Sequence, residues 1–336
     1  MSALKLKLTL DAKPANHKIN YGERLLLMGS CFTENIGLKL QAHLFETLEN
    51  SHGILFNPVS VQNALMDIIS NKKYTESELF LLNDVWNSWH HHSRFSGVSQ
   101  QEALDKINGA IQEAHSYLKS AHHLVITLGS AWLYTLNGNA PDHMGMVVAN
   151  NHKAPANWFT KKLLQPQELL SNLHTLVTHL ESFNPNLHIV FTISPVRHLR
   201  EGLVENNRSK AVLIQAVHDL VSMEKNIEYF PAYEYVIDDL RDYRFYAEDL
   251  VHPNYAATQY VWEKLVDTYM TADTQSIMKQ VAELQLAFNH KPFFSGSTEH
   301  QKFLLSYIEK TKFLMAQCPQ LPLEKHLLFF KGAIGK

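Results

Sequence analysis

The sequence predicts a doubly wound α/β fold, in which a mostly parallel sheet lies between two layers of helices. Short, continuously apolar runs alternate with longer stretches of helical periodicity along most of the chain. Strands without polar alternation are buried on both faces, as they are in parallel sheets covered by crossover helices. Several of these runs also end in Gly or Ser, where a parallel strand turns into its crossover. Together these observations indicate a three-layer α/β/α architecture.

The first strand-and-helix unit has the clearest boundaries. Residues 24–30 (RLLLMGS) form an apolar run that ends in Gly-Ser, and residues 33–44 then show helical spacing. A second unit is expected from a weaker strand at 44–48 and a helix at 59–70. The chain therefore begins the sheet with two such units.

The later units follow the same pattern. Three further apolar, β-branched runs predict strands, and four amphipathic stretches predict the helices that connect them. Since ligands bind at the carboxyl ends of the strands in such sheets, residues that follow these runs are expected to converge on one rim. The strands are expected at 123–128, 187–193 and 227–230, and the helices at 99–120, 165–183, 207–223 and 254–270.

Two stretches break this rhythm, and the pattern changes again near the end. Residues 71–97 and 134–162 are rich in Trp, His and Asn and are expected as insertions over the rim. We expect an α/β domain over residues 1–270 and a C-terminal helical extension over residues 271–336. Two helices are predicted in the extension, at 274–288 and 299–317.

Composition excludes several classes of function. The formal charge of −3 provides no broad positive surface for nucleic acid or anionic membranes. Cys31 and Cys318 form no CxxC or Cys/His motif, which argues against a disulfide scaffold or a structural zinc and favours a reducing compartment. The N-terminus lacks the apolar core of a secretion signal, and no run approaches the roughly 20 apolar residues of a membrane span. We expect a cytoplasmic protein without nucleic-acid partners or integral membrane association.

Ser30 is a candidate nucleophile because of its position in the chain. A catalytic serine needs a sharp turn beside backbone N–H groups that can stabilise an oxyanion. The segment Gly29-Ser30-Cys31-Phe32, between a predicted strand and a predicted helix, offers that setting. The alternative is an ordinary turn in which Ser30 caps the helix. This short motif is compatible with both interpretations.

Asp249 and His252 form a second candidate pair, three residues apart and directly before a helix opened by Pro253. This spacing lets the carboxylate hold one ring nitrogen while the other faces a serine. The alternative is a loop aspartate that solvates the helix start, with His252 merely exposed. Combined with a Gly-Ser at the end of the first strand, the pair resembles the arrangement of SGNH, or GDSL-type, hydrolases.

More closely, the chain resembles the GSCFA family, named for a motif that reads Gly29-Ser30-Cys31-Phe32-Thr33 here. The resemblance runs over most of the chain and implies the SGNH fold, a flavodoxin-like three-layer α/β/α arrangement. The segments that carry it are GILFNP (53–58), HSRFS (92–96), TLGSAW (127–132), ISPVRH (193–198), NRSKAVL (207–213) and LRDYRFYAEDLVHPN (240–254).

The resemblance implies roles for individual residues. Ser30 corresponds to the nucleophile, His252 to the general base and then acid, and Asp249 to the residue that orients His252. The backbone N–H groups of Ser30 and Gly53 would form the oxyanion hole. The expected chemistry is therefore acyl transfer through a serine ester.

The third sequence block departs from the SGNH pattern. SGNH enzymes usually carry GxND there, whereas Gly129 is followed by Ser-Ala-Trp, so the side-chain amide donor is missing. Loss of one such donor typically costs about 3 kcal/mol of transition-state stabilisation. Either Asn57 or Ser130 replaces it, or these residues are only a turn-forming Asn-Pro and a helix cap.

Several other residues are candidates for substrate binding. Gly129 and Ser194 follow predicted strands and therefore belong to the rim. His92 and Arg94 are candidates for lining the pocket, with a solvated loop as the alternative. Among several arginines with acidic neighbours that could pair with them, Arg197 is the best candidate to hold a substrate carboxylate or phosphate. The histidine run that ends at His92 cannot easily face one ion, so no metal site is predicted.

The sequence thus predicts a serine-dependent ester hydrolase or O-acyltransferase that forms a covalent acyl-enzyme. Its substrate would be a small-molecule, glycan or lipid acyl ester, and the chemistry requires no metal or organic cofactor. Cys31 would point elsewhere on the turn than Ser30, so core packing is its better interpretation. The main alternative is a binding protein that has kept the fold without the chemistry. A nucleotide-binding enzyme ranks lower because GxGxxG and GxxxxGK[ST] motifs are missing.

Overall fold

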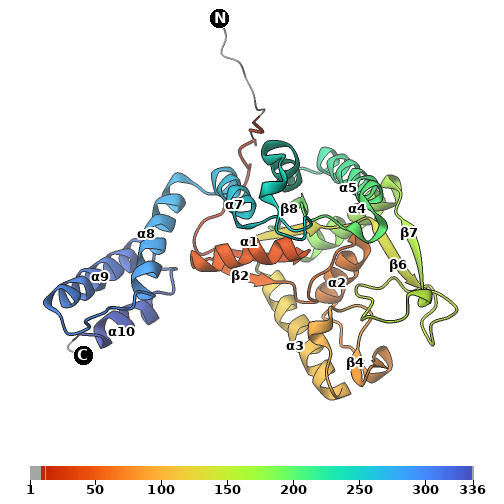
Figure 1. Cartoon of the computed structure of the whole chain (residues 1–336), viewed down its shortest axis with the longest axis horizontal. Helices are drawn as coiled ribbons and strands as arrows, with labels where there is room; N and C mark the ends of the chain where they lie inside the picture. The colour runs from red at the N-terminus through yellow and green to blue at the C-terminus, as the bar shows by residue number, and fades with distance from the viewer. Residues whose placement is uncertain (1–8, 12, 335–336) are drawn as a thin grey trace, which may run out of the picture.

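A computed structural model describes residues 9–11 and 13–334 of the chain and contains a five-stranded sheet at its centre (Figure 1). All neighbouring strands in this sheet are parallel. The strand order is β2–β1–β5–β8–β9, so the chain winds outward from β1 in both directions. The strands are β1 (Arg24–Gly29), β2 (Glu46–Glu49), β5 (His123–Leu128), β8 (His188–Ile193) and β9 (Ile227–Phe230).

Helices cover both faces of the sheet. The covering helices are α1 (Cys31–Ala42), α2 (Pro58–Ser70), α3 (Gln100–Leu118), α4 (Pro166–Phe183), α5 (Leu203–Met223) and α7 (Tyr255–Tyr269). On β1, Leu26 and Met28 pack in a hydrophobic cluster with residues of α2–α5. Leu25 and Leu27 pack on the other face with residues of α1 and α7. The predicted doubly wound, three-layer fold is confirmed.

Most predicted helices and strands of the α/β part agree with the structure to within two residues. The exception is α5, which was expected to begin at residue 207 and begins at Leu203. Its first two residues, Leu203 and Val204, are apolar but exposed. They therefore do not follow the periodicity of a buried helix face, from which the helix start was predicted. Short turns complete this part: η4 (Leu199–Glu201), α6 (Ala232–Glu234), the π-helical turn η5 (Tyr235–Leu240) and η6 (Tyr243–Phe245).

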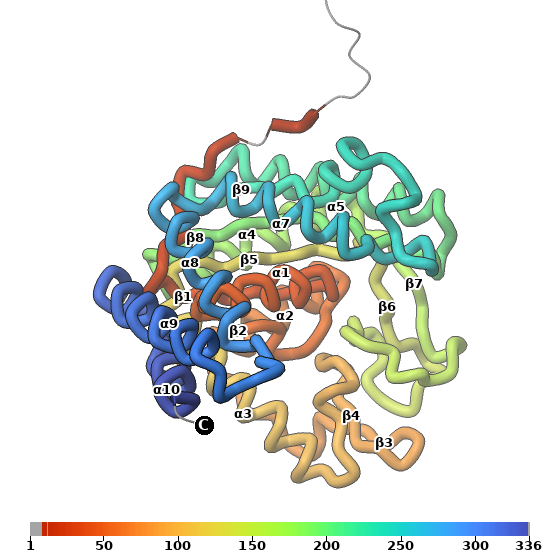
Figure 2. Tube along the Cα trace, turned by 60° about the vertical axis from the view of Figure 1, so that its left-hand side comes forward, coloured from red at the N-terminus to blue at the C-terminus, as the bar shows by residue number. Residues whose placement is uncertain are grey.

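The two predicted insertions each contain an antiparallel hairpin. Both hairpins lie away from the C-terminal end of the chain, as Figures 1 and 2 show. The second hairpin begins two residues before the expected insertion, because its first strand starts at Trp132. The elements are η1 (Glu76–Glu78), β3 (Phe80–Leu82), β4 (Val85–Asn87), η2 (Ser93–Phe95), β6 (Trp132–Leu136), η3 (Ala156–Trp158) and β7 (Phe159–Leu163).

The C-terminal region contains three helices, α8 (Ala272–Phe288), α9 (Thr298–Gln317) and α10 (Glu324–Gly332), so the expectation of two was wrong. The missed α10 is short and follows a Pro-containing loop. The three helices share a hydrophobic cluster of their own, against which Tyr21 and Leu44 of the α/β part also pack. The division at residue 270 stays a prediction.

Phe330 tests whether this small cluster is a packed core. Its side chain is fully buried among residues of α8 and α9, so Phe330→Ala should lower the free energy of unfolding of this region by about 3–5 kcal/mol. Phe293→Ala is the matched control, because that ring is 99% exposed and its removal should change stability by less than about 0.5 kcal/mol. Urea unfolding would measure both variants. Equal stabilities for the two would contradict the packing described.

Candidate active site

Ser30 lies where β1 ends and α1 begins. Gly29 has φ 133°, and a Cβ at that position would lie 2.1 Å from the carbonyl oxygen of Thr127 on the neighbouring β5, so only glycine fits. Ser30 is fully buried, and its Oγ accepts a 3.3 Å hydrogen bond from the backbone N–H of Phe32. Its own N–H donates to Thr127 O at 3.2 Å. Ser30 is therefore the N-cap of α1, at the carboxyl end of the first strand.

The loop that contains Gly53 crosses the end of β1 beside Ser30. Asn50 Oδ1 accepts from the N–H of Gly29 at 2.8 Å, and the N–H of Leu55 donates to Gly29 O at 2.9 Å. Gly53 has φ 79°, and a Cβ there would lie 2.2 Å from Cβ of His92. The glycine thus permits the close approach of the 92–94 segment. The structure brings Gly53, His92 and Ser30 to the same region of the rim.

Asp249 and His252 are hydrogen-bonded to each other. Nδ1 of His252 lies 2.6 Å from Oδ2 of Asp249, while Asp249 Oδ1 accepts from the N–H groups of Val251 at 2.9 Å and His252 at 3.0 Å. These bonds, led by the backbone bond from His252, lower the pKa of Asp249 to about 2. The two side chains are 50% and 52% exposed, so the pair faces solvent as well as the protein.

The loop that carries this pair is attached to the end of β8. The N–H of Arg197 donates to Val251 O at 3.1 Å, and its Nη1 donates to Leu250 O at 3.2 Å. Val251 also packs against a hydrophobic cluster that contains Phe32, two residues after Ser30. The Asp249–His252 loop therefore lies at the same end of the sheet as Ser30, although more than 200 residues separate them in the sequence.

The four predicted oxyanion groups already have partners within the protein. The N–H of Gly53 donates to Asn50 O at 2.6 Å, and the N–H of Ser30 donates to Thr127 O at 3.2 Å. Asn57 caps α2 through Oδ1, and its Nδ2 donates to Ser60 Oγ at 2.9 Å and Val148 O at 3.4 Å. Ser130 Oγ accepts from the N–H of Trp132 at 3.2 Å and lies 3.2 Å from Ser209 Oγ. Their role as donors to an oxyanion stays a prediction.

The predicted substrate-binding residues also have internal contacts. His92 caps η2, and Arg94 forms an ion pair with Glu34 in the first turn of α1. The guanidinium of Arg197 lies over the ring of Tyr246, at 4.1 Å. Ser194 Oγ accepts from the N–H of Val196 at 3.3 Å. All of them lie at the rim, and their role in substrate binding stays a prediction.

A groove of about 540 Å³ adjoins this end of the sheet. Trp132 and Tyr134 of the second hairpin form one side of it, and Arg200 lies over the Tyr134 ring at 4.9 Å. Ser130 and Arg197, both predicted site residues, line it as well. Residues 148–154 of the second insertion complete the wall.

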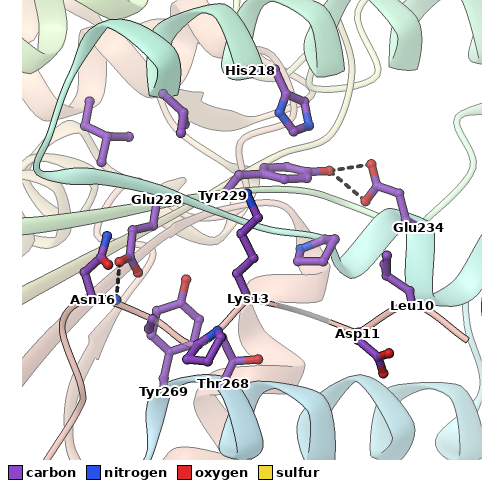
Figure 3. A pocket seen from close by; sticks show the side chains of 15 residues that line it. Leu10, Asp11, Lys13, Asn16, His218, Glu228, Tyr229, Glu234, Thr268 and Tyr269 are labelled. Carbon is purple, nitrogen blue, oxygen red and sulfur yellow. Dashed lines mark hydrogen bonds between the residues drawn. The ribbon is translucent and has the colours of Figure 1, made fainter.

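A second cavity, of about 560 Å³, lies along the outer edge of β9 and has no predicted site residue in its lining (Figure 3). Tyr229 in this cavity donates to both oxygens of Glu234 at 2.8 Å, and Asn16 of the N-terminal segment donates through its N–H to Glu228 at 2.6 Å. These hydrogen bonds join residues of the cavity to one another, and neither Asp249 nor His252 lines it.

Lys210 is a residue of the site that sequence reasoning missed. It is fully buried in α5, and its Nζ donates to Gly129 O at 2.7 Å and Ser194 O at 2.6 Å, just beyond the ends of β5 and β8. No carboxylate of the described residues forms an ion pair with it. The sequence did offer a signal. Lys210 lies three residues before Leu213, on the face of the helix that is buried, where an apolar residue is expected.

Burial also lowers the pKa of Lys210 from its ordinary 10.5 to about 7, against a smaller opposing effect of Cys31. The unfolded chain keeps this proton up to about pH 10.5, whereas the folded protein releases it near pH 7. The free energy of unfolding should therefore rise with pH between these values, by roughly 5 kcal/mol in full.

We expect the rise to be missing in Lys210→Met, because methionine does not titrate. Urea unfolding at several pH values would give the free energy of unfolding of the wild type and of the variant. The contributions of the other titrating groups cancel in the difference between the two proteins. Lys106→Met, at an exposed position of α3, is the control that should follow the wild type. Parallel curves for wild type and Lys210→Met would contradict the assigned shift.

Within the described residues, no three His, Cys, Asp or Glu side chains are grouped as a metal site would require. None of the helices in that part of the chain has the length and apolar composition needed to cross a membrane.

A family model described as "GSCFA family" matches residues 24–265, which include every residue of the site described above. The chain belongs to the GSCFA family. A second model, "GSCFA domain protein, C-terminal domain", matches residues 281–334 of this GSCFA protein. None of the curated proteins compared with the chain matches it.

Several solved structures are similar to this GSCFA protein at low TM-scores. An acetyl xylan esterase (Est2A) from Butyrivibrio proteoclasticus matches with 11% identity and a TM-score of 0.36, over 74% of this chain and 63% of that one. A putative platelet activating factor from Streptococcus pneumonia matches with 15% identity and a TM-score of 0.38, over 73% and 83%. A family two carbohydrate esterase from Clostridium thermocellum, solved with cellohexaose, matches with 14% identity and a TM-score of 0.36, over 78% and 66%. The chain thus spans slightly less than two thirds of the first and third of these proteins.

Proposed function

We propose that this GSCFA protein is a serine-dependent ester hydrolase or O-acyltransferase, with Ser30 as nucleophile, His252 as general base and Asp249 as its orienting partner. One observation carries the proposal. The Asp249–His252 pair is joined by a 2.6 Å hydrogen bond in a loop attached to the carboxyl end of the sheet, where Ser30 also lies. A carboxylate on Nδ1 leaves Nε2 of His252 available to accept a proton.

In the proposed reaction, Nε2 of His252 takes the proton of Ser30 as Oγ attacks the carbonyl carbon of an ester. The carbonyl π electrons move to oxygen and form an oxyanion. When the carbonyl re-forms, the bond to the alcohol oxygen breaks, and His252 returns the proton to that leaving group. Water or a second alcohol then attacks the acyl-Ser30 ester by the same steps and releases the acyl group. The residues of the chain suffice for these steps, without metal or cofactor.

Access to Ser30 requires a local rearrangement, because the side chain has no exposed surface. The segment that carries His92 and Arg94 lies against Gly53, and Arg94 is paired with Glu34 on α1. We propose that substrate entry displaces this segment. The groove beside Ser130 and Arg197 then holds the rest of a small-molecule, glycan or lipid acyl ester. A cytoplasmic location remains part of the proposal.

A binding protein without catalytic activity is the second candidate function. The specific observation in its favour is that Ser30 is buried as a helix cap and that each predicted oxyanion donor already has an internal partner. Such a protein would bind an ester in the groove and leave it intact.

Turnover of model esters separates the two candidates. The purified protein would be assayed with p-nitrophenyl esters of short and long acyl chains, and with Ser30→Ala as the control for background hydrolysis. We expect release of p-nitrophenol above the Ser30→Ala rate with at least one chain length. Equal rates for both proteins with every ester, together with binding of esters in the groove, would support the second candidate.

A further inference from the structure

The missing asparagine of the third sequence block leaves the proposed reaction without a side-chain donor to the oxyanion. Asn57 Nδ2 already donates to Ser60 Oγ and Val148 O, and the Ser130 hydroxyl already lies within hydrogen-bond distance of Ser209 Oγ. We propose that His198 fills this role, with its Nε2–H as the donor to the oxyanion of the acyl-transfer reaction. The inference rests on the proposed function and adds a catalytic residue to it.

The ring of His198 lies against the third block. A Cβ built on Gly129 would be 3.0 Å from His198 Nε2 and 3.2 Å from the carbonyl oxygen of Phe56. Nε2 is buried and has no hydrogen-bond partner among the described residues. A buried ring nitrogen without a partner is costly, and this one lies beside the end of β5, where it is free to bond to a ligand atom.

Contacts on two sides hold His198 between the third sequence block and the Asp249–His252 loop. The N–H of His198 donates to Asn206 Oδ1 at 2.8 Å, and the N–H of the preceding Arg197 donates to Val251 O at 3.1 Å. The ring packs edge-on against Phe56, with centroids 5.0 Å apart. The Phe56 carbonyl in turn accepts from the N–H groups of Gly129 and Ser130, both at 2.9 Å. A preorganised donor of this kind needs no reorientation as charge develops.

The charge state of His198 suits a donor that does not release its proton. Burial, followed by the positive charges of Lys210 and His252, lowers the pKa of His198 to about 3. The imidazole is therefore neutral at ordinary pH and carries one N–H, which we assign to Nε2. As Ser30 Oγ bonds to the carbonyl carbon, the carbonyl electron pair moves to oxygen. The hydrogen bond from Nε2–H of His198 to that oxygen then strengthens. The proton stays on His198, and this hydrogen bond weakens again when the carbonyl re-forms.

Substitutions of His198 test this role with the p-nitrophenyl ester that the wild type hydrolyses fastest. His198→Ala should lower kcat by about 10²–10³-fold with KM changed less than about threefold, because the bond forms only in the transition state. His198→Asn restores an amide donor and should recover kcat at least about tenfold over His198→Leu, which fills the space without a donor. His174→Ala, at an exposed position of α4, is the matched control and should keep the wild-type kcat.

The possible outcomes are distinct. If wild type hydrolyses esters and His198→Ala retains kcat within about threefold of it, the role of His198 is overturned while the proposed function stands. If wild type hydrolyses no ester and its Ser30 forms no covalent adduct, the proposed function fails and this inference with it. If His198→Ala does not fold, as judged by circular dichroism, the comparison between His198→Asn and His198→Leu decides. Equal kcat values for those two overturn the assignment, and a higher value for asparagine supports it.

Discussion

Replacing Ser30 by alanine is expected to lower kcat for a hydrolysed ester by about 10⁴-fold or more, because the acyl-enzyme can no longer form. The residual rate would come from binding and oxyanion stabilisation alone. Ester hydrolysis measured under saturating substrate would show the loss. Because Ser30 also caps α1, unfolding of the variant must be measured too, and a stability loss of about 0.5–2 kcal/mol is expected.

Cys31→Ala is the control for this experiment. Burial raises the pKa of the Cys31 thiol above its ordinary value, so the thiol stays protonated and is a poor nucleophile. We expect Cys31→Ala to keep turnover close to that of the wild type. Retained turnover in Ser30→Ala, or loss of turnover in Cys31→Ala with normal folding, would contradict the assignment of the nucleophile.

Asp249→Asn is expected to lower kcat by about 10³–10⁴-fold with little change in KM. The amide cannot balance the positive charge that His252 acquires in the transition state, and its N–H₂ favours the wrong ring tautomer. Glu248→Gln is the matched control, because this neighbouring carboxylate is exposed and outside the pair. Steady-state kinetics of both variants would measure the contrast, and equal kcat values would exclude an orienting role for Asp249.

The pH dependence of wild-type activity is a second test of the role of Asp249. A carboxylate with a lowered pKa contributes its bond to His252 above that pKa and loses it only as the pH falls through it. For Asp249 this point is about pH 2, well below the range of an ordinary assay. Titration of Asp249 should therefore not limit activity between about pH 4 and pH 9.

The layered part of the fold was predictable because its strands are continuously apolar and its helices are periodic. Residues 123–128 illustrate this, since β5 has the predicted bounds. The start of α5 and the whole of α10 were missed for a common reason. Leu203 and Val204 are exposed apolar residues, and α10 has nine residues, of which only His326 and Phe330 are buried, so neither shows a full amphipathic period.

The candidate site was predictable only where chemistry follows a strand end in the sequence. Ser30 comes directly after β1, and Asp249 and His252 are close enough in sequence to be recognised as a pair. Lys210 contacts Gly129 and Ser194, and His198 lies beside Gly129, so both join the site through residues that follow β5 and β8. Such contacts depend on the order of strands in the sheet, which local sequence patterns do not specify.

The most direct test of the account is covalent labelling of the wild type by a fluorophosphonate, which reacts with activated serines. Intact-mass analysis and peptide mapping should find one adduct, located on Ser30. The adduct should be lost in Ser30→Ala and retained in Cys31→Ala. No adduct on the wild type under any condition, or an adduct that persists in Ser30→Ala, would contradict a catalytic Ser30.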